Sequence, residues 1–584
     1  MTATPDTTTP DTTTPDTTAP DVTAPDVTAP TPVAPAPVYA PSRTHEVTNQ
    51  VPLPYGHDTA ADPTLLAGLH RAGAGWAEAE LHELGRLAGS EQAADWGRLA
   101  NENPPVLRTH DRFGHRIDEV EFHPYWHELM RTAVGHGLHA TPWRDGRPGA
   151  HSARAAKFFV WGQVEAGHTC PISMTYAAVP ALRANPALAA ELEPLLAATE
   201  YDFGLREPHG KRGLIAGMSM TEKQGGSDVR TNTTTAAPQA DGTYRLTGHK
   251  WFTSAPMSDL FLTLAQAPGG LSCFMLPRVL PDGTRNRLHL QRLKDKLGNK
   301  SNASAELEYD GAVGWLVGEE GRGVRTIIEM VNMTRLDCTV GAASGMRLGA
   351  TRAVQHALHR RAFGKALVDQ PLMRNVLADL VVESEAATVV AMRLAEATDR
   401  ALAGDGTEAL VRRLGLAVAK YWVCKRGPAH AAEALECLGG NGYVEESGMP
   451  RLYREAPLVS IWEGSGNVAA LDALRAMAKH PETVEAFLGE LDAAAGADRR
   501  LDAAVAELRK QLTDLSDLEY RTRRLVEAMA LAFQGSLLVR HGDPAVADAF
   551  CASRLGGDHG AAFGTLPAGL DAGAIIDRAR PVPA

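Results

Sequence analysis

The chain changes its hydrophobic period twice, and this change restricts the folds open to it more than any other feature. From about residue 65 to 205, apolar residues recur at spacings of three and four, which is typical of amphipathic helices. Between about 214 and 317 they form short runs of β-favouring residues, and after Gly323 the helical period returns. The order α, then β, then α predicts a mainly α protein with a central, antiparallel β domain.

Individual elements can be placed on this pattern. Early helices are predicted at Leu65–Ala74, Ala77–Leu87 and Ala181–Leu196. Strands are predicted at Tyr244–Thr247, Leu260–Leu264 and Leu271–Leu276, since Asp-Gly and Pro-Gly-Gly turn signals separate them. Long helices are predicted at Val324–Arg361, Leu372–Leu402 and Leu410–Cys437. Because these three contain many small residues, we expect them to pack closely in an antiparallel bundle.

The chain begins with a low-complexity repeat. A five-residue unit of Thr, Pro, Asp and Ala recurs through residue 42, and ten of the 37 prolines lie there. Such a segment buries too little apolar surface to offset its chain entropy, so we predict a disordered tail, with a docking arm as the alternative. The predicted organisation is a tail at 1–42, an N-terminal helical domain at 43–212, a middle β domain at 213–320, a four-helix-bundle domain at 321–480 and a C-terminal helical domain at 481–584.

Composition excludes several classes of protein. A length of 584 residues excludes a single small binding module, and a net charge of −12 argues against a globally basic nucleic-acid binder. The six cysteines form no C-x-x-C pair, which indicates reduced thiols, a cytoplasmic location and no zinc cluster. No apolar run is long enough to span a membrane. His123 and His127 have metal-ligand spacing, but without a third ligand motif we predict no metal site.

Five segments contain residues that can carry chemistry, although neither a G-x-G-x-x-G motif nor a P-loop is present. Met218–Asp228 has a Thr and consecutive glycines that can bind a polar, planar or phosphorylated ligand, or form an ordinary turn. Gly248–Ser254 has an aromatic pair followed by hydroxyls, which can pack against a flavin ring or belong to a β core. The segment from His359 to Lys365, with Gln370, can bind a pyrophosphate or end a helix favourably. Leu438–Tyr443 can simply be a turn that ends a helix.

The fifth segment, Ile461–Asn467, contains a candidate base. Glu463 follows the apolar residues Leu458, Val459, Ile461 and Trp462. A carboxyl group partly removed from water by such neighbours has a raised pKa, which suits a general base. The alternative is an ordinary acidic loop residue.

Taken together and in this order, the five segments resemble the acyl-CoA dehydrogenase family of flavoproteins, and most closely its AidB branch of adaptive-response proteins. The residues that carry the closer resemblance are Met220–Asp228, Leu293–Asn299, Met333–Cys338 and Ser460–Asn467. The resemblance covers roughly 43–584. It implies a helical domain, a β-barrel-like domain and a four-helix bundle, with FAD between the last two, plus the additional C-terminal helical domain of AidB-like chains.

The resemblance also implies roles for individual residues. Glu463 matches the catalytic base, which would take an α-proton from an acyl thioester while hydride passes from the β-carbon to the flavin. The alternative base of isovaleryl-type members falls near Thr334 and is absent. Residues that match FAD contacts are Met218, Met220, Thr221, Gly226, Ser227, Phe252, Thr253, Ser254, Ile461, Trp462, Ser465 and Asn467. Residues that match contacts to the FAD of a neighbouring subunit are Arg360, Phe363, Gln370, Gly439 and Gly440, which implies a homotetramer.

The implied activity is α,β-dehydrogenation of a short or branched acyl-CoA-like thioester, with electrons passed to an external acceptor. Three positions depart from the family pattern: Trp462 replaces Tyr, while Glu436 and Asn467 each replace Gln. The resemblance also offers an alternative, a flavoprotein of the DNA alkylation response that binds double-stranded DNA through its last domain. Candidate DNA contacts there are Arg521, Arg523 and Arg524. The domain as a whole is acidic, with 11 basic and 16 acidic residues, so we rank DNA binding second.

Overall fold

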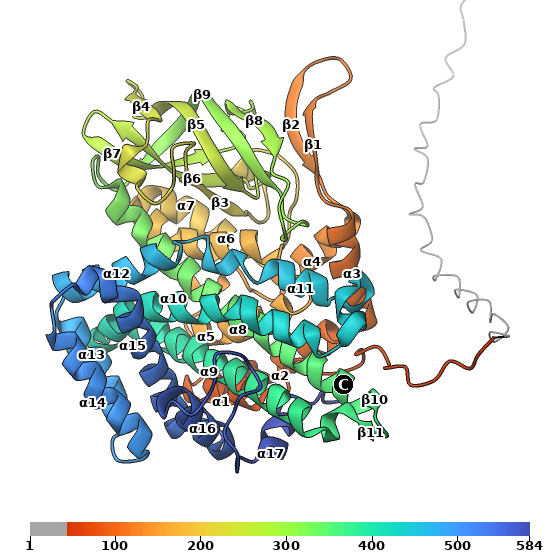
Figure 1. Cartoon of the computed structure of the whole chain (residues 1–584). Coiled ribbons are helices and arrows are strands. Elements are labelled where there is room, and N and C mark those ends of the chain that lie inside the picture. Colours follow the sequence, from red (N-terminus) through yellow and green to blue (C-terminus); the bar gives the residue numbers. More distant parts are fainter. Residues whose placement is uncertain (1–43) are drawn as a thin grey trace, which may run out of the picture. The chain divides into compact units, whose positions relative to one another are not determined.

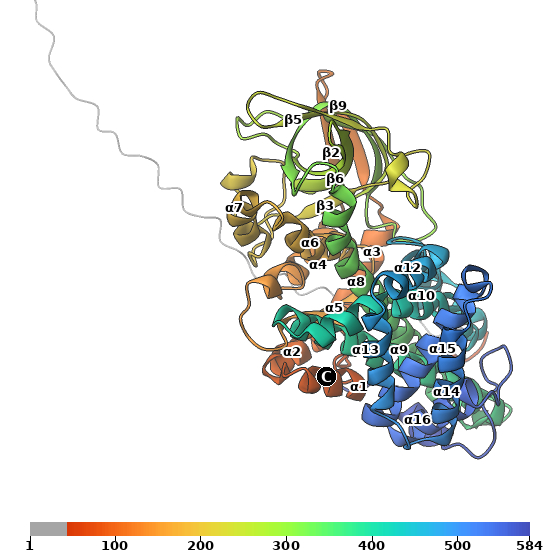
Figure 2. The same ribbon diagram turned by 90° about the vertical axis from the view of Figure 1, so that its left-hand side faces the viewer.

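The computed structural model describes residues 44–584, so the predicted tail at 1–42 lies outside the described residues. The body from Asn49 onward is one unit, and Figures 1 and 2 show the strands between residues 216 and 317 at one end and most of the helices toward the other. Together these features confirm the predicted class: mainly helical, with a central β-barrel domain and further C-terminal helices. None of the helices among residues 44–584 is both long and apolar enough to span a membrane. All six cysteines are free and buried.

The N-terminal part of the body is helical except for one hairpin. Its helices are α1 (Pro63–Arg71), α2 (Glu78–Ala88), α3 (Glu91–Glu102), α4 (Pro124–Gly135), α5 (Ala150–Gly162), α6 (Thr169–Leu182) and α7 (Pro186–Leu196). The single helix predicted at Ala181–Leu196 is wrong, because Asn185 caps α7 by accepting from the Leu188 amide and Pro186 begins the new helix. The hairpin β1 (Val106–His110) and β2 (Arg116–Glu121) was not predicted, because its strands are short and mostly exposed.

The β domain is a closed sheet. Its strands are β3 (Ala216–Ser219), β4 (Thr235–Pro238), β5 (Tyr244–Ser254), β6 (Leu260–Ala267), β7 (Gly270–Pro277), β8 (Leu288–Leu293) and β9 (Ser304–Val317). They follow the order β3-β6-β4-β5-β9-β7, and the pairing of β6 with β7 closes the barrel, while β8 adds to β9. The three predicted strands lie within β5, β6 and β7. Most pairs are antiparallel as expected, but β3 and β4 each pair with β6 in parallel.

Three long helices follow the β domain in the chain and form the core of the helical bundle. These are α8 (Gly323–His359), α9 (Pro371–Leu402) and α10 (Gly406–Glu436), each within four residues of its predicted ends. A small two-stranded turn, β10 (Arg361–Ala362) and β11 (Lys365–Ala366), joins α8 to α9. The middle of α9 is buried on all sides, and its Arg393 is paired at 2.8 Å with both Glu408 and Glu490. Short α11 (Met449–Glu455) and α12 (Gly466–Lys479) complete the bundle.

The last helices pack against the outside of α9 and α10 (Figures 1 and 2). They are α13 (Glu482–Asp492), α14 (Arg499–Thr513), α15 (Leu518–His541), α16 (Pro544–Phe550) and α17 (Ala572–Asp577). Their apolar side chains, including Phe487 and Phe533, belong to the same hydrophobic core as the bundle. Arg554 also pairs with Glu383 of α9 at 3.1 Å. These helices therefore extend the bundle core.

Candidate active site

One cavity of about 900 Å³ brings together three of the five candidate segments. It lies where the β domain meets α6, α8 and the loop between α11 and α12. The predicted site residues that line it are Met218, Met220, Thr221, Gly226, Ser227, Phe252, Ser254, Ile461, Trp462, Glu463 and Ser465. Segments that are more than 200 residues apart in the chain thus form a single wall.

Other predicted residues lie elsewhere. Thr253 points into the barrel, where its hydroxyl is 2.6 Å from that of Ser219. Outside the cavity wall lie Arg360, Phe363, Gln370, Gly439, Gly440 and Asn467. The first three meet at the β10–β11 turn, where the Gln370 amide donates to the Ala362 carbonyl at 3.0 Å and the Phe363 side chain is 98% exposed. Arg360, Phe363 and Gln370 therefore lie on an outer surface that is separate from the cavity.

Glu463 stands in the loop that precedes α12 and has an unusual backbone. Its φ is +59°, a left-handed conformation that costs energy for a residue other than glycine. Its carboxylate accepts a hydrogen bond from the Thr334 hydroxyl of α8 at 2.8 Å. Burial raises the pKa of Glu463 above its usual value, while the Thr334 hydrogen bond and the charges of Arg335 and Lys420 oppose this rise. A buried carboxyl group with a raised pKa is a stronger proton acceptor than an exposed one, which suits a general base.

Two buried cations hold the backbone of this loop. Arg335 of α8 donates from Nε to the Glu463 carbonyl at 3.2 Å and is paired through Nη1 with Asp472 at 2.6 Å. Lys420 of α10 donates from Nζ to the next carbonyl, that of Gly464. Sequence reasoning did not find Lys420. Its one signal is that it is a lone cation in the otherwise uncharged stretch from Leu414 to Cys424.

A β-bulge in β5 directs the aromatic pair. Lys250 lies opposite Leu307 of β9 and Thr253 opposite Ala305, so β5 has one extra residue at this point. Lys250 and Thr253 both face the interior as a result, and Phe252 is 52% exposed on the cavity side. Bulges commonly redirect a side chain beside a functional site. The Trp251 amide donates to the Thr221 carbonyl at 2.8 Å, which ties the bulge to the loop that begins at Met220.

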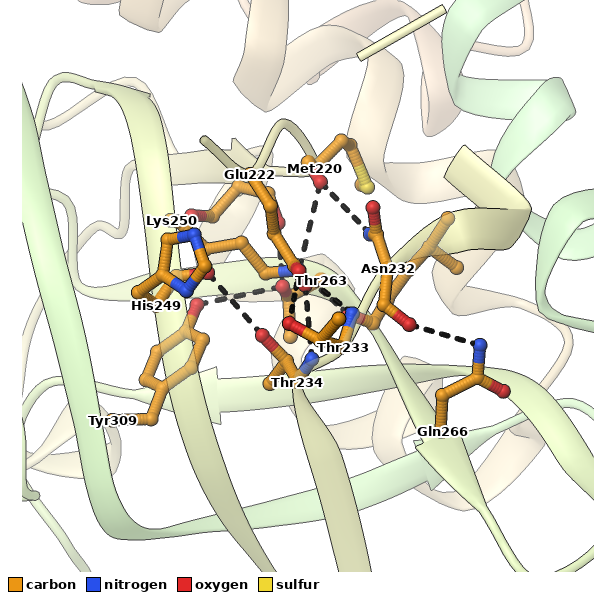
Figure 3. Close-up of polar contacts among 12 residues, drawn as sticks. Met220, Glu222, Asn232, Thr233, Thr234, His249, Lys250, Thr263, Gln266 and Tyr309 are labelled. Atoms are coloured by element: carbon orange, nitrogen blue, oxygen red, sulfur yellow. Dashed lines mark hydrogen bonds and ion pairs between the residues drawn. The ribbon is translucent and has the colours of Figure 1, made fainter. Parts of the chain in front are cut away.

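A buried ion pair links β5 to the loop that begins at Met220 (Figure 3). The Lys250 ammonium is 2.9 Å from the Glu222 carboxylate and also donates to the Leu264 carbonyl at 2.8 Å. Glu222 accepts further hydrogen bonds from Thr233 and Thr234. Although burial alone would raise the pKa of Glu222, these hydrogen bonds and the Lys250 charge hold it well below its usual range. The carboxylate is therefore fully satisfied and fixes the loop to the barrel.

The residues considered for metal and DNA binding have structural partners. His123 caps α4, and His127 lies 3.0 Å from the Tyr201 hydroxyl; no cluster that could hold a metal occurs among residues 44–584. Arg521 is paired with Asp514 at 3.2 Å, and Arg523 donates to the Tyr421 hydroxyl at 3.1 Å. Arg524 is exposed on α15. The predicted basic patch is thus partly engaged within the protein.

Comparison with known families matches most of the chain. Residues 49–203 match the adaptive response protein AidB N-terminal domain, residues 217–312 the acyl-CoA dehydrogenase middle domain, and residues 321–478 the acyl-CoA dehydrogenase C-terminal domain. Among curated relatives, AidB of Escherichia coli (strain K12) is 46% identical over 512 residues, which cover 87% of this chain and 94% of the relative.

Solved structures agree. ACDH-11 of Caenorhabditis elegans, in complex with C11-CoA, superposes with a TM-score of 0.80 and 29% identity, covering 88% of this chain and 94% of that one. An acyl-CoA dehydrogenase of Bacillus anthracis shares the fold, with a TM-score of 0.60 at 18% identity over 74% of this chain and 81% of that one. The Glu463 cavity, the order of domains and these likenesses all agree: the chain belongs to the acyl-CoA dehydrogenase family of oxidoreductases, and within it to the AidB branch.

Proposed function

We propose that the protein is an FAD-dependent dehydrogenase that introduces an α,β double bond into an acyl thioester, with Glu463 as the base. The observation that carries this proposal is the position of Glu463. Its carboxyl lines the same cavity as Thr221 and Phe252, the residues that match flavin contacts. A base and a site for a planar cofactor therefore share one enclosed space.

The residues of the cavity fit a flavin. Phe252 offers an exposed aromatic side chain, and the hydroxyls of Thr221, Ser227 and Ser254 offer hydrogen bonds. The Trp462 indole N–H also lines this region and is buried, with no hydrogen-bond partner among residues 44–584. Gly226 allows close approach of the loop, since a Cβ there would lie 2.4 Å from the Thr221 hydroxyl. FAD has a planar ring with polar edges and a phosphorylated tail, and these polar groups can accept the hydrogen bonds that the cavity offers.

In the proposed reaction, Glu463 accepts the α-proton of the thioester on its carboxylate. Thr334 and the buried cations hold that carboxylate toward the cavity and resist its protonation beforehand. Bound FAD would supply the two-electron acceptor for the hydride that leaves the β-carbon. Apolar walls from α6 and α8 exclude water from the carbanion-like charge as it develops. An external acceptor then takes the electrons.

The cavity suggests a longer acyl chain than the short or branched one expected from sequence. Its wall continues along α8 past Thr334 to Gly341, Gly345 and Leu348, roughly 20 Å along the helix axis. A Cβ placed on Gly341 would be in ordinary van der Waals contact with the Phe158 ring at 3.9 Å, so the cavity wall is close-packed but not crowded at this point. The relative ACDH-11 was solved with C11-CoA. We therefore propose a medium or long acyl-CoA.

Anaerobic bleaching of the flavin tests this function. Wild-type protein should copurify with FAD and lose its absorbance near 450 nm on addition of straight-chain acyl-CoAs, most readily at about C8–C12. Glu463→Gln should retain FAD but bleach at least ~100-fold more slowly, because Gln cannot accept the α-proton. Absence of flavin, or equal bleaching by both proteins, would contradict the proposal.

We also propose that a second copy of the chain covers the surface around the β10–β11 turn, in a homotetramer. Phe363 is 98% and Leu372 84% exposed there. Large apolar side chains exposed together mark an interaction surface. Because Arg360, Gln370, Gly439 and Gly440 match contacts to a neighbour's FAD, this assembly would complete the cofactor site.

The DNA-binding alternative has less support, because Arg521 and Arg523 are engaged within the chain. A gel-shift titration against salt distinguishes it from the first proposal. Binding to double-stranded DNA that weakens steeply with salt, and is reduced in a variant lacking Arg521, Arg523 and Arg524, would support the alternative.

A further inference from the structure

Lys420 is a buried cation that lacks an ionic partner. Its side chain is 1% exposed, and among residues 44–584 it forms no ion pair. Its ammonium donates to the Gly464 carbonyl. Arg335, the other cation at this loop, is paired with Asp472, which Arg413 also contacts at 2.9 Å. A buried charge is costly unless it is balanced, so the isolated ammonium of Lys420 requires an explanation.

The carbonyl that Lys420 contacts belongs to the residue next to the proposed base. Gly464 follows Glu463, and both have positive φ, +59° and +103°. Lys420 and Arg335 bind the two successive carbonyls of this strained turn from two different helices. Such a conformation persists only where the surroundings fix it. The two contacts therefore determine where the Glu463 carboxylate points.

The charges around Glu463 show why Lys420 matters electrostatically. Arg335, Thr334 and Cys338 face it from α8, Cys170 from α6 and Lys420 from α10. Arg335 shares the single carboxylate of Asp472 with Arg413, so its positive charge is only partly neutralised. Burial raises the pKa of both thiols, so they stay neutral near pH 7. Together with Arg335, Lys420 thus supplies positive charge that favours an ionised Glu463, and among residues 44–584 it does so without a carboxylate partner of its own.

We propose that Lys420 is a positioning residue for Glu463: its hydrogen bond to Gly464 fixes the strained turn, and its charge keeps the carboxylate ionised in an apolar cavity until substrate arrives. The inference rests on the proposed role of Glu463 as the base. The negative charge of the Glu463 carboxylate in turn balances the positive charge of the Lys420 ammonium. A purely structural Lys420 would instead act only through its hydrogen bond to the carbonyl.

Three variants separate charge from hydrogen bonding. Lys420→Gln keeps a hydrogen-bond donor, on a side chain one bond shorter, but removes the charge; Lys420→Met removes both, and Lys420→Arg keeps the charge. Lys510→Met is the control, because it removes an exposed lysine on α14. Each protein is prepared with bound FAD and mixed anaerobically with C11 acyl-CoA across pH 5–9.

The midpoint of the pH–bleaching profile is expected to rise by about one unit in Lys420→Gln and Lys420→Met, the shift that loss of one nearby charge produces at intermediate dielectric. At pH values well below the wild-type midpoint, bleaching should fall about tenfold, with KM changed less than about twofold. Lys420→Arg should keep the wild-type midpoint, as should Lys510→Met. The carboxyl infrared band that Glu463→Gln removes should titrate with the same shift, independently of turnover.

Other outcomes would overturn the inference. A wild-type midpoint in Lys420→Gln, with only a lower Tm, would show that the lysine is structural. If Lys420→Met does not fold, Lys420→Gln and Lys420→Arg still decide the matter. Failure of the proposed function is recognised separately, because wild-type flavin would then not be bleached, whereas the infrared titration would still report whether Lys420 controls ionisation of Glu463.

Discussion

At the scale of single residues, the site works by balancing opposing effects on one carboxyl group. Burial in the cavity favours protonated Glu463, whereas Thr334 and the neighbouring cations favour the carboxylate. A base must be ionised before reaction yet basic enough to take a proton, so neither effect can dominate. The Thr334 hydroxyl contributes most directly, since it bonds the carboxylate at 2.8 Å.

Replacing Thr334 by Val tests this balance. Loss of a hydrogen bond to a charged acceptor removes about 1.4 kcal/mol, so the pKa of Glu463 should rise further and the pH–bleaching midpoint should shift upward by about one unit. Flavin content should not change. Thr326→Val, on the same helix and half-buried, serves as control. An unchanged midpoint in Thr334→Val would show that the hydroxyl does not act on the base.

At the scale of elements, the bulge in β5 and the loop at Met220 form one structural unit. The bulge turns Phe252 toward the cavity, while Lys250 remains in the barrel and binds Glu222 of the loop. Phe252 and the loop at Met220, on the same wall of the cavity, therefore both depend on one buried ion pair (Figure 3). Breaking such a pair by removing one charge is strongly destabilising, because the other charge stays buried.

Glu222→Gln should therefore lower the free energy of unfolding by about 3–5 kcal/mol at neutral pH, measured by denaturant titration of the flavin-free protein. Because the pKa of Glu222 lies below its usual value in the folded protein, its stabilising contribution is present above about pH 4.5 and is lost as the pH falls further. The difference between variant and wild type should thus shrink in acid. Glu308→Gln, exposed on β9, should unfold like wild type at every pH.

The sequence pattern predicts these elements well where a long, regular period exists. Helices α8, α9 and α10 follow directly from it, whereas the β1–β2 hairpin has no buried face long enough to produce a signal. The bulge at Trp251 and Phe252 depends on pairing with a strand about 50 residues away, which local pattern does not contain. Lys420 was missed for the same reason: its role depends on a loop 44 residues further along.

At the scale of the whole molecule, the exposed apolar side chains around the β10–β11 turn predict assembly. Leu372→Asp should place a charge in the interface and lower the mass measured by light scattering from four copies to one or two. Leu515→Asp, equally accessible in the loop before α15, should remain tetrameric. A wild-type protein that is monomeric at micromolar concentration would contradict the proposed assembly.

The cavity draws its wall from α5 and α6, the β domain, α8, α10 and the loop that carries Glu463. These pieces are spread along the chain from Phe158 to Arg475, so the pocket forms only when distant parts of the body have met. Retention of a coloured cofactor would therefore report completed folding. A chain in which any one wall of the cavity is misplaced should not retain the cofactor, even if its secondary structure has already formed.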